Sequence, residues 1–112
     1  MLFHTMVGSN DIDRAKRFYD TVLGTLGVGE ASINVADSGH TRLIYNSGNG
    51  ANFIVTQPIN DEPATVANGS TIAFSCNSPE QVKQFHDVAV VNGGMSIEVA
   101  PGPRETASMG TI

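Results

Sequence analysis

The sequence contains a single cysteine, no tryptophan and few charged residues, which make up 15% of its 112 residues. With Cys76 alone, the chain can form neither an internal disulfide nor a zinc site built from several cysteines. Basic residues are scarcer than acidic ones, at six against eleven, and the formal net charge is −5. Nucleic acids and anionic membranes bind basic surfaces, so we expect neither as a partner.

Long apolar runs are also absent. No stretch approaches the roughly 20 apolar residues that a membrane-spanning helix needs. The first residues lack the basic and apolar regions of a secretory signal, so we expect a cytoplasmic protein. A length of 112 residues, with 40% hydrophobic residues, predicts one domain with a modest core.

The first half of the chain predicts one helix among four strands. Residues 9–11 form a polar helix cap, and apolar side chains at helical spacing continue to about residue 23. Short apolar runs separated by turns rich in glycine, asparagine and serine indicate the strands. The predicted strands are residues 2–7, 31–36, 41–45 and 52–57.

The same order starts again 67 residues later. Residues 70–75 predict a strand, and Ser78-Pro79-Glu80-Gln81 is a capping box with proline at the first helical position. Identical residues align at this offset: Asn10 with Asn77, Lys16 with Lys83, Phe18 with Phe85, Asp20 with Asp87, and Gly27 with Gly94. We therefore predict a single domain made of two copies of one unit. Repeat one spans about residues 1–57, a linker about residues 58–68, and a truncated repeat two about residues 69–112.

The second copy is shorter than the first. At the offset of 67, Ile112 corresponds to Tyr45, so the last strand of the second unit has no residues. The predicted fold is α+β, with two β-α-β-β-β-type units of which the second lacks its last strand. An uncovered sheet edge exposes unpaired backbone groups, so we expect a homodimer that covers it; the alternative is a natural chain that extends beyond Ile112. Candidate residues for that seam are Ile97, Val99, Met109 and Ile112.

The start of the chain carries the most specific resemblance to a known family. His4-Thr5-Met6 precedes Asp13-Arg14-Ala15-Lys16-Arg17-Phe18-Tyr19, and residues 69–74 and 100–104 continue the likeness. Together with the paired units, these residues resemble the vicinal oxygen chelate superfamily of glyoxalase I, bleomycin- and fosfomycin-resistance proteins and extradiol dioxygenases. The chain is most similar to the small bacterial glyoxalase-like members. The resemblance implies a small-molecule cavity enclosed by strands from both units.

In metal-using members of this family, the ligands come from the first and last strands of each unit. The corresponding positions here are His4, Ile54, Thr71 and the absent last strand. Only the first is a metal ligand, whereas open catalytic sites use about three protein ligands. The resemblance therefore implies no metal site and no cofactor, unless a partner chain or a missing tail supplies ligands beyond His4.

The resemblance also implies which residues line the cavity. Side-chain alternation places His4 and Met6 on one face of the first strand. Arg42 either points into the cavity, where it would hold an anionic group, or extends along a strand edge. Arg104 either binds a carboxylate or phosphonate or is a surface residue beside Glu105. The candidate ligand-binding residues are His4, Met6, Arg42, Thr56, Thr71, Ala73 and Arg104.

Three functions are compatible with these residues. The first is binding of a small molecule without the family's metal. The second is a metal-dependent lyase or dioxygenase whose site is completed by a partner chain or a missing tail. The third is an inert remnant whose only role is association. These alternatives leave open whether the chain is an enzyme, and no catalytic residue is assigned.

Overall fold

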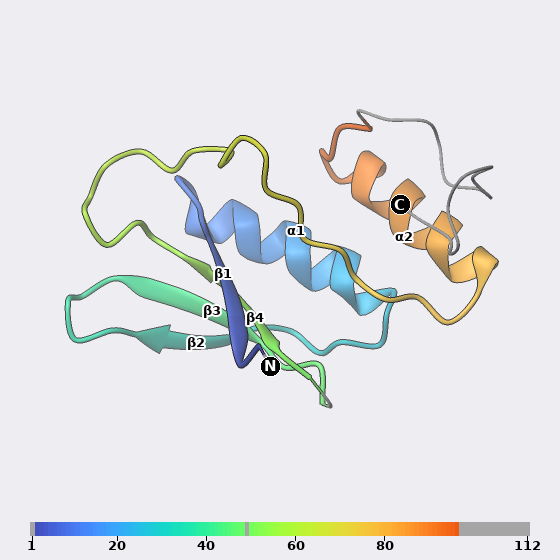
Figure 1. Cartoon of the computed structure of the whole chain (residues 1–112), viewed down its shortest axis with the longest axis horizontal. Coiled ribbons are helices and arrows are strands. Elements are labelled where there is room, and N and C mark those ends of the chain that lie inside the picture. Colours follow the sequence, from blue (N-terminus) through green and yellow to red (C-terminus); the bar gives the residue numbers. More distant parts are fainter. Residues whose placement is uncertain (1, 49, 97–112) are drawn as a thin grey trace.

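The part of the chain that the structure describes folds as a four-stranded sheet with two helices. In this computed structural model, which describes residues 2–48 and 50–96, helix α1 lies against the sheet and α2 lies beside α1 (Figure 1). The elements are β1 (His4–Gly8), α1 (Ile12–Gly24), β2 (Ser32–Val35), β3 (Thr41–Tyr45), β4 (Asn52–Thr56) and α2 (Pro79–Val91). The helix and the four strands predicted for the first unit are all confirmed.

The strand order in the sheet is β1-β4-β3-β2. Strand β1 runs parallel to β4, whereas β4, β3 and β2 form an antiparallel meander. The edges are therefore β1 and β2, and the two interior strands are β3 and β4. This arrangement brings the start of the chain beside a strand that follows it by almost 50 residues, with His4 opposite Asn52.

The hydrophobic core lies between α1 and one face of the sheet. The sheet contributes Leu43, Tyr45, Phe53 and Val55, all odd-numbered and all buried, as the two-residue period of a strand requires. From the helices, Val22, Leu23 and Phe85 pack into the same cluster. The other face of the sheet thus carries the even-numbered side chains.

The two helices begin and end in the same way. Asp11 caps α1 by accepting a hydrogen bond from the backbone of Arg14 at 3.0 Å, and Ser78 caps α2 by accepting from Gln81 at 3.1 Å. Each helix has 13 residues, and both bounds differ by the offset of 67 found in the sequence. Within the described chain, neither helix is long and apolar enough to cross a membrane.

The predicted strand at residues 70–75 is not formed. A strand requires a neighbour for its backbone hydrogen bonds, and none of the four strands of the sheet pairs with this segment. Instead, the segment contacts the core through Phe74, whose ring packs against the rings of Phe53 and Phe85. The next predicted strand after Ser96, the candidate seam residues and Arg104 lie outside the described residues.

Candidate functional site

The face of the sheet opposite α1 collects most of the predicted site residues of the first unit. The strand registers place side chains of alternating residues from all four strands on this face, which we call the open face. Its members are His4, Met6, Gly8, Ser32, Asn34, Arg42, Ile44, Asn52, Ile54 and Thr56. The structure therefore brings His4, Met6, Arg42 and Thr56 onto one face of the sheet.

Three rows run across the open face at right angles to the strands. The first row is polar and consists of Gly8, Thr56, Arg42 and Asn34. The second row is largely apolar and consists of Met6, Ile54, Ile44 and Ser32. The third row contains His4 beside Asn52. Adjacent rows are about 7 Å apart, because side chains on one face recur every second residue of a strand.

The linker forms a wall at the polar end of the open face. A Cβ atom on Gly8 would lie 3.1 Å from the Cβ atom of Ala64, so glycine permits this close approach. The backbone N–H of Ala64 also donates to the side chain of Asn10 at 2.6 Å. Further along the linker, Asp61 pairs with His40 in the turn between β2 and β3 at 2.8 Å. These contacts connect the linker to the end of β1 and to the turn between β2 and β3.

Arg42 belongs to the interior strand β3, and the register places it on the open face. Its Nε atom is buried and has no hydrogen-bond partner among the residues that the structure describes. Its neighbours in the polar row are Thr56 and Asn34. The Thr56 hydroxyl donates to the carbonyl oxygen of Gln57 at 2.8 Å, so its proton is already used.

His4 is exposed in the row at the opposite end of the face, and Met6 is exposed in the middle row. The imidazole of His4 lies edge-on to Phe3, with ring centroids 5.7 Å apart. Its register neighbour is the amide of Asn52, and the family's second ligand position is occupied by Ile54, which is only 8% exposed. No group of three His, Cys, Asp or Glu side chains that could hold a metal occurs in residues 2–48 and 50–96. The described residues therefore do not fit the family's metal centre.

The segment that precedes α2 contributes less to this face than the sequence predicts. Thr71 and Ala73 are exposed, and their neighbour Phe74 packs on the α1 side against Phe53. The structure thus does not place Thr71 and Ala73 on the open face. Cys76 in the same segment is half-buried, and burial raises the pKa of its thiol, which argues against a nucleophilic cysteine.

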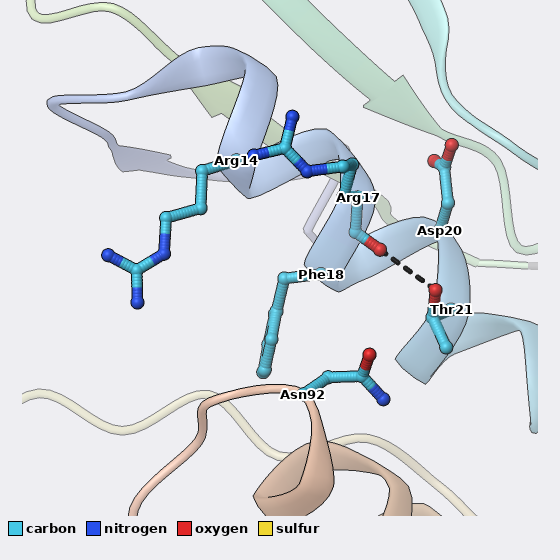
Figure 2. Close-up of a pocket in the computed structure, with 6 residues that line it drawn as sticks. All are labelled: Arg14, Arg17, Phe18, Asp20, Thr21 and Asn92. Atoms are coloured by element: carbon cyan, nitrogen blue, oxygen red, sulfur yellow. Dashed lines mark hydrogen bonds between the residues drawn. The ribbon is translucent and has the colours of Figure 1, made fainter.

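A concave surface lies between α1 and the end of α2. Figure 2 shows Phe18 of α1 pointing toward Asn92, with Arg14 and Arg17 on the exposed side of the helix. The groove is open to solvent. The Thr21 hydroxyl in its wall donates a hydrogen bond to the Arg17 carbonyl oxygen at 2.9 Å. The groove is lined by helix residues and contains none of the open-face residues.

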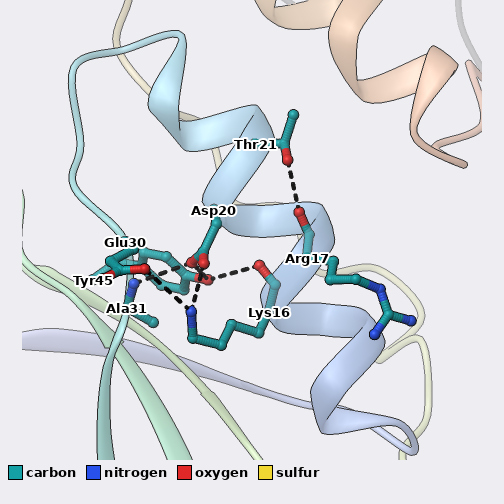
Figure 3. A network of polar contacts seen from close by, with 7 residues as sticks. All are labelled: Lys16, Arg17, Asp20, Thr21, Glu30, Ala31 and Tyr45. Atoms are coloured by element: carbon teal, nitrogen blue, oxygen red, sulfur yellow. Dashed lines mark hydrogen bonds and ion pairs between the residues drawn. The ribbon is translucent and has the colours of Figure 1, made fainter.

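A polar network lies under α1, on the core side of the sheet (Figure 3). The Asp20 carboxylate accepts hydrogen bonds from the Tyr45 hydroxyl at 2.7 Å, from Lys16 at 2.6 Å and from the backbone of Ala31 at 3.1 Å. Tyr45 therefore packs beneath the helix and does not line the open face. Burial raises the pKa of Tyr45, and the neighbouring carboxylate raises it further, so the hydroxyl stays a neutral donor.

Sequence reasoning missed five members of the open face: Gly8 at the end of β1, and Ser32, Asn34, Ile44 and Asn52 on the other strands. The period-two pattern of β2, β3 and β4 was a signal that they share a face with their strand neighbours. Their position beside Arg42, Ile54 and His4 follows only from the registers between strands.

Comparisons with known proteins identify the family. The model of the Glyoxalase/Bleomycin resistance protein/Dioxygenase superfamily matches residues 1–112. The crystal structure of a glyoxalase/bleomycin resistance protein from Albidiferax ferrireducens T118 is similar, with 46% sequence identity and a TM-score of 0.84, over 94% of this chain and 82% of that chain. No curated protein matches the sequence. The α+β fold and the family resemblance are thereby confirmed: the chain belongs to the Glyoxalase/Bleomycin resistance protein/Dioxygenase superfamily.

Proposed function

We propose that this chain binds a small organic molecule on the open face of its sheet and does so without a metal. The observation that carries the proposal is the composition of that face, where an apolar row lies between two polar rows. The Nε atom of Arg42 and the imidazole of His4 make no hydrogen bond within the described residues, so both have hydrogen-bonding capacity left for a ligand. Ligand sites combine apolar walls with a few polar groups, and the open face has this mixed composition.

The proposed contacts come from both units. His4, Met6, Arg42 and Thr56 are already together on the open face. Thr71, Ala73 and Arg104 of the second unit stay in the proposal as residues that would close over the ligand. We further propose that a second copy of the chain covers the incomplete half, and that the protein acts in the cytoplasm.

The test starts from metal-free protein, whose metal content is measured by mass spectrometry. Thermal unfolding is then followed with nickel, zinc, manganese and iron(II), and ligands are screened by two-dimensional amide NMR. We expect no stoichiometric metal, no metal-dependent rise in melting temperature, and saturable ligand shifts at β1, β3 and β4.

Two variants decide between this function and its alternatives. Stoichiometric metal, with stabilisation that is lost in His4→Ala and kept in His86→Ala on α2, would replace the proposal by a metal-dependent lyase or dioxygenase. If no member of a broad ligand panel shifts open-face amides, the chain serves association only.

A further inference from the structure

We infer that the ligand of the open face is an organic oxyanion with an apolar body, and that Arg42 holds its anionic end. This inference rests on the proposed function and specifies its substrate class. The oxyanion is a carboxylate, phosphonate or phosphate group, which share the planar or near-planar pair of oxygens that a guanidinium recognises.

The charge distribution supports an anion. The chain has eleven acidic residues and a net charge of −5, yet none of the ten residues on the open face is Asp or Glu. The ionisable side chains on this face are Arg42 and His4. An otherwise acidic protein thus presents a positive charge on this surface, which attracts anions and repels cations.

The buried Nε atom of Arg42 supports a direct contact. A buried N–H group without a hydrogen bond is costly and uncommon in folded proteins. The unpaired atom is Nε, which together with one terminal nitrogen forms the edge that binds two oxyanion oxygens at once. Because no carboxylate within the described residues pairs with Arg42, a bound oxyanion would supply the missing acceptor.

The rows determine where the rest of the ligand lies. At the polar end of the face the linker contacts Gly8 through Ala64 and His40 through Asp61, so the ligand extends toward the apolar row of Met6, Ile54 and Ile44. That row begins about 7 Å from Arg42, the length of a short alkyl chain or one aromatic ring. His4 lies two rows away, about 13 Å along the strand direction, so only a longer ligand reaches both groups.

A matched pair of probes tests the inference. Hexanoate and hexanamide have the same apolar chain and differ in charge, and hexylphosphonate tests the other oxyanion class. Binding is measured by amide NMR titration of the intact protein at low salt. We expect hexanoate or hexylphosphonate to bind at least about tenfold more tightly than hexanamide, with the largest shifts at β3 and β4. Whichever anion binds more tightly identifies the class.

Variants separate a binding role from a structural one. Arg42→Gln should weaken oxyanion binding at least about tenfold and leave hexanamide unchanged, whereas Arg17→Gln on the exposed side of α1 removes the same charge and should change neither. Arg42→Met should keep or raise the melting temperature, because it removes an unpaired buried group. A clear drop in melting temperature would show that Arg42 is structural and would overturn the inference.

Failure of the inference and failure of the proposed function give different results. If the anions and hexanamide bind equally well and shift open-face amides, the face binds small molecules but Arg42 does not select anions. If no probe shifts the open face while a member of the broad ligand panel does, the inference is contradicted and the binding function stands; if nothing in the panel shifts it either, both are contradicted.

Discussion

Asp20 illustrates how a single residue connects distant parts of this chain. Its carboxylate on α1 contacts Tyr45 of β3 and the backbone of Ala31 ahead of β2, while Lys16 approaches from the preceding helical turn. Partial burial alone would raise the pKa of Asp20, but these hydrogen bonds outweigh it and hold the pKa below its usual value. The ionised form is therefore the one that stabilises the fold.

Replacing Asp20 by Asn should lower the free energy of unfolding by about 1–2 kcal/mol at neutral pH, because a charged acceptor of three hydrogen bonds becomes a neutral one. The side chain is 22% exposed, which keeps the effect in the lower part of the range for charged groups. Chemical denaturation at pH 7 measures the difference.

The pH dependence provides a second readout for the same residue. A carboxyl group whose pKa is lowered by folding stabilises the protein above its unfolded pKa and loses that contribution as the pH falls through its folded pKa. The difference between wild type and Asp20→Asn should thus be constant near neutrality and shrink below about pH 4. Asp87→Asn, at the matching position of α2, is the control. Asp87 has no tyrosine partner and is 49% exposed, so a loss as large as that of Asp20→Asn would contradict this account.

At the scale of elements, α2 is joined to α1 at its first turn by Gln81. The side-chain oxygen of Gln81 accepts from the backbone N–H of Asn77, the residue before the N-cap, at 2.5 Å, while the backbone N–H of Gln81 donates to the Ser78 hydroxyl. Its side-chain nitrogen donates to the carbonyl oxygen of Thr25, the C-cap residue of α1, at 3.2 Å. One amide thus satisfies backbone groups at the start of one helix and the end of the other.

Substitution of Gln81 by Ala should lower the free energy of unfolding by about 1–2 kcal/mol, because two backbone groups at helix ends lose their partners. Gln84→Ala is a matched control on an exposed position of the same helix, where alanine's helix propensity makes the change neutral or slightly stabilising. Thermal unfolding of both variants tests this. Equal melting temperatures for the two would show that the contact between the helix ends adds no stability.

Local patterns predicted the elements better than their pairing. The helix caps, the strands of the first unit and the shared face of His4 and Met6 depend on neighbouring residues, and all were predicted correctly. The placement of Arg42 required the register between β3 and β4, and the wall over Gly8 required a contact with Ala64 far along the chain. The strand predicted at residues 70–75 had the right composition but finds no pairing strand in the sheet. Pairing is a non-local property, and local patterns carry little information about it.

At the scale of the whole molecule, the β2 edge is the part of the sheet that α1 leaves uncovered. All four residues of β2 are exposed, and Ile33 and Val35 are each 63% exposed although they share a face with the core. None of the strands formed by residues 2–48 and 50–96 pairs with the outer side of β2, so within this part of the chain its backbone groups are open to pairing. An edge with apolar side chains and free backbone groups is complementary to itself when two copies are related by a two-fold axis.

We therefore predict that the proposed homodimer uses this edge, with β2 of one copy antiparallel to β2 of the other. Light scattering coupled to size-exclusion chromatography should give the mass of a dimer for the wild type. The double substitution of Ile33 and Val35 by Lys should give a monomer with an unchanged circular dichroism spectrum, because like charges at the edge repel and resist burial. Val66→Lys in the linker adds a charge at a more exposed apolar position and should leave the dimer intact. A wild-type monomer would contradict the homodimer itself, whereas a dimer that survives both edge substitutions would place the contact on another surface. In the second case the uncovered half of the second unit, from which the dimer was first predicted, becomes the surface to test.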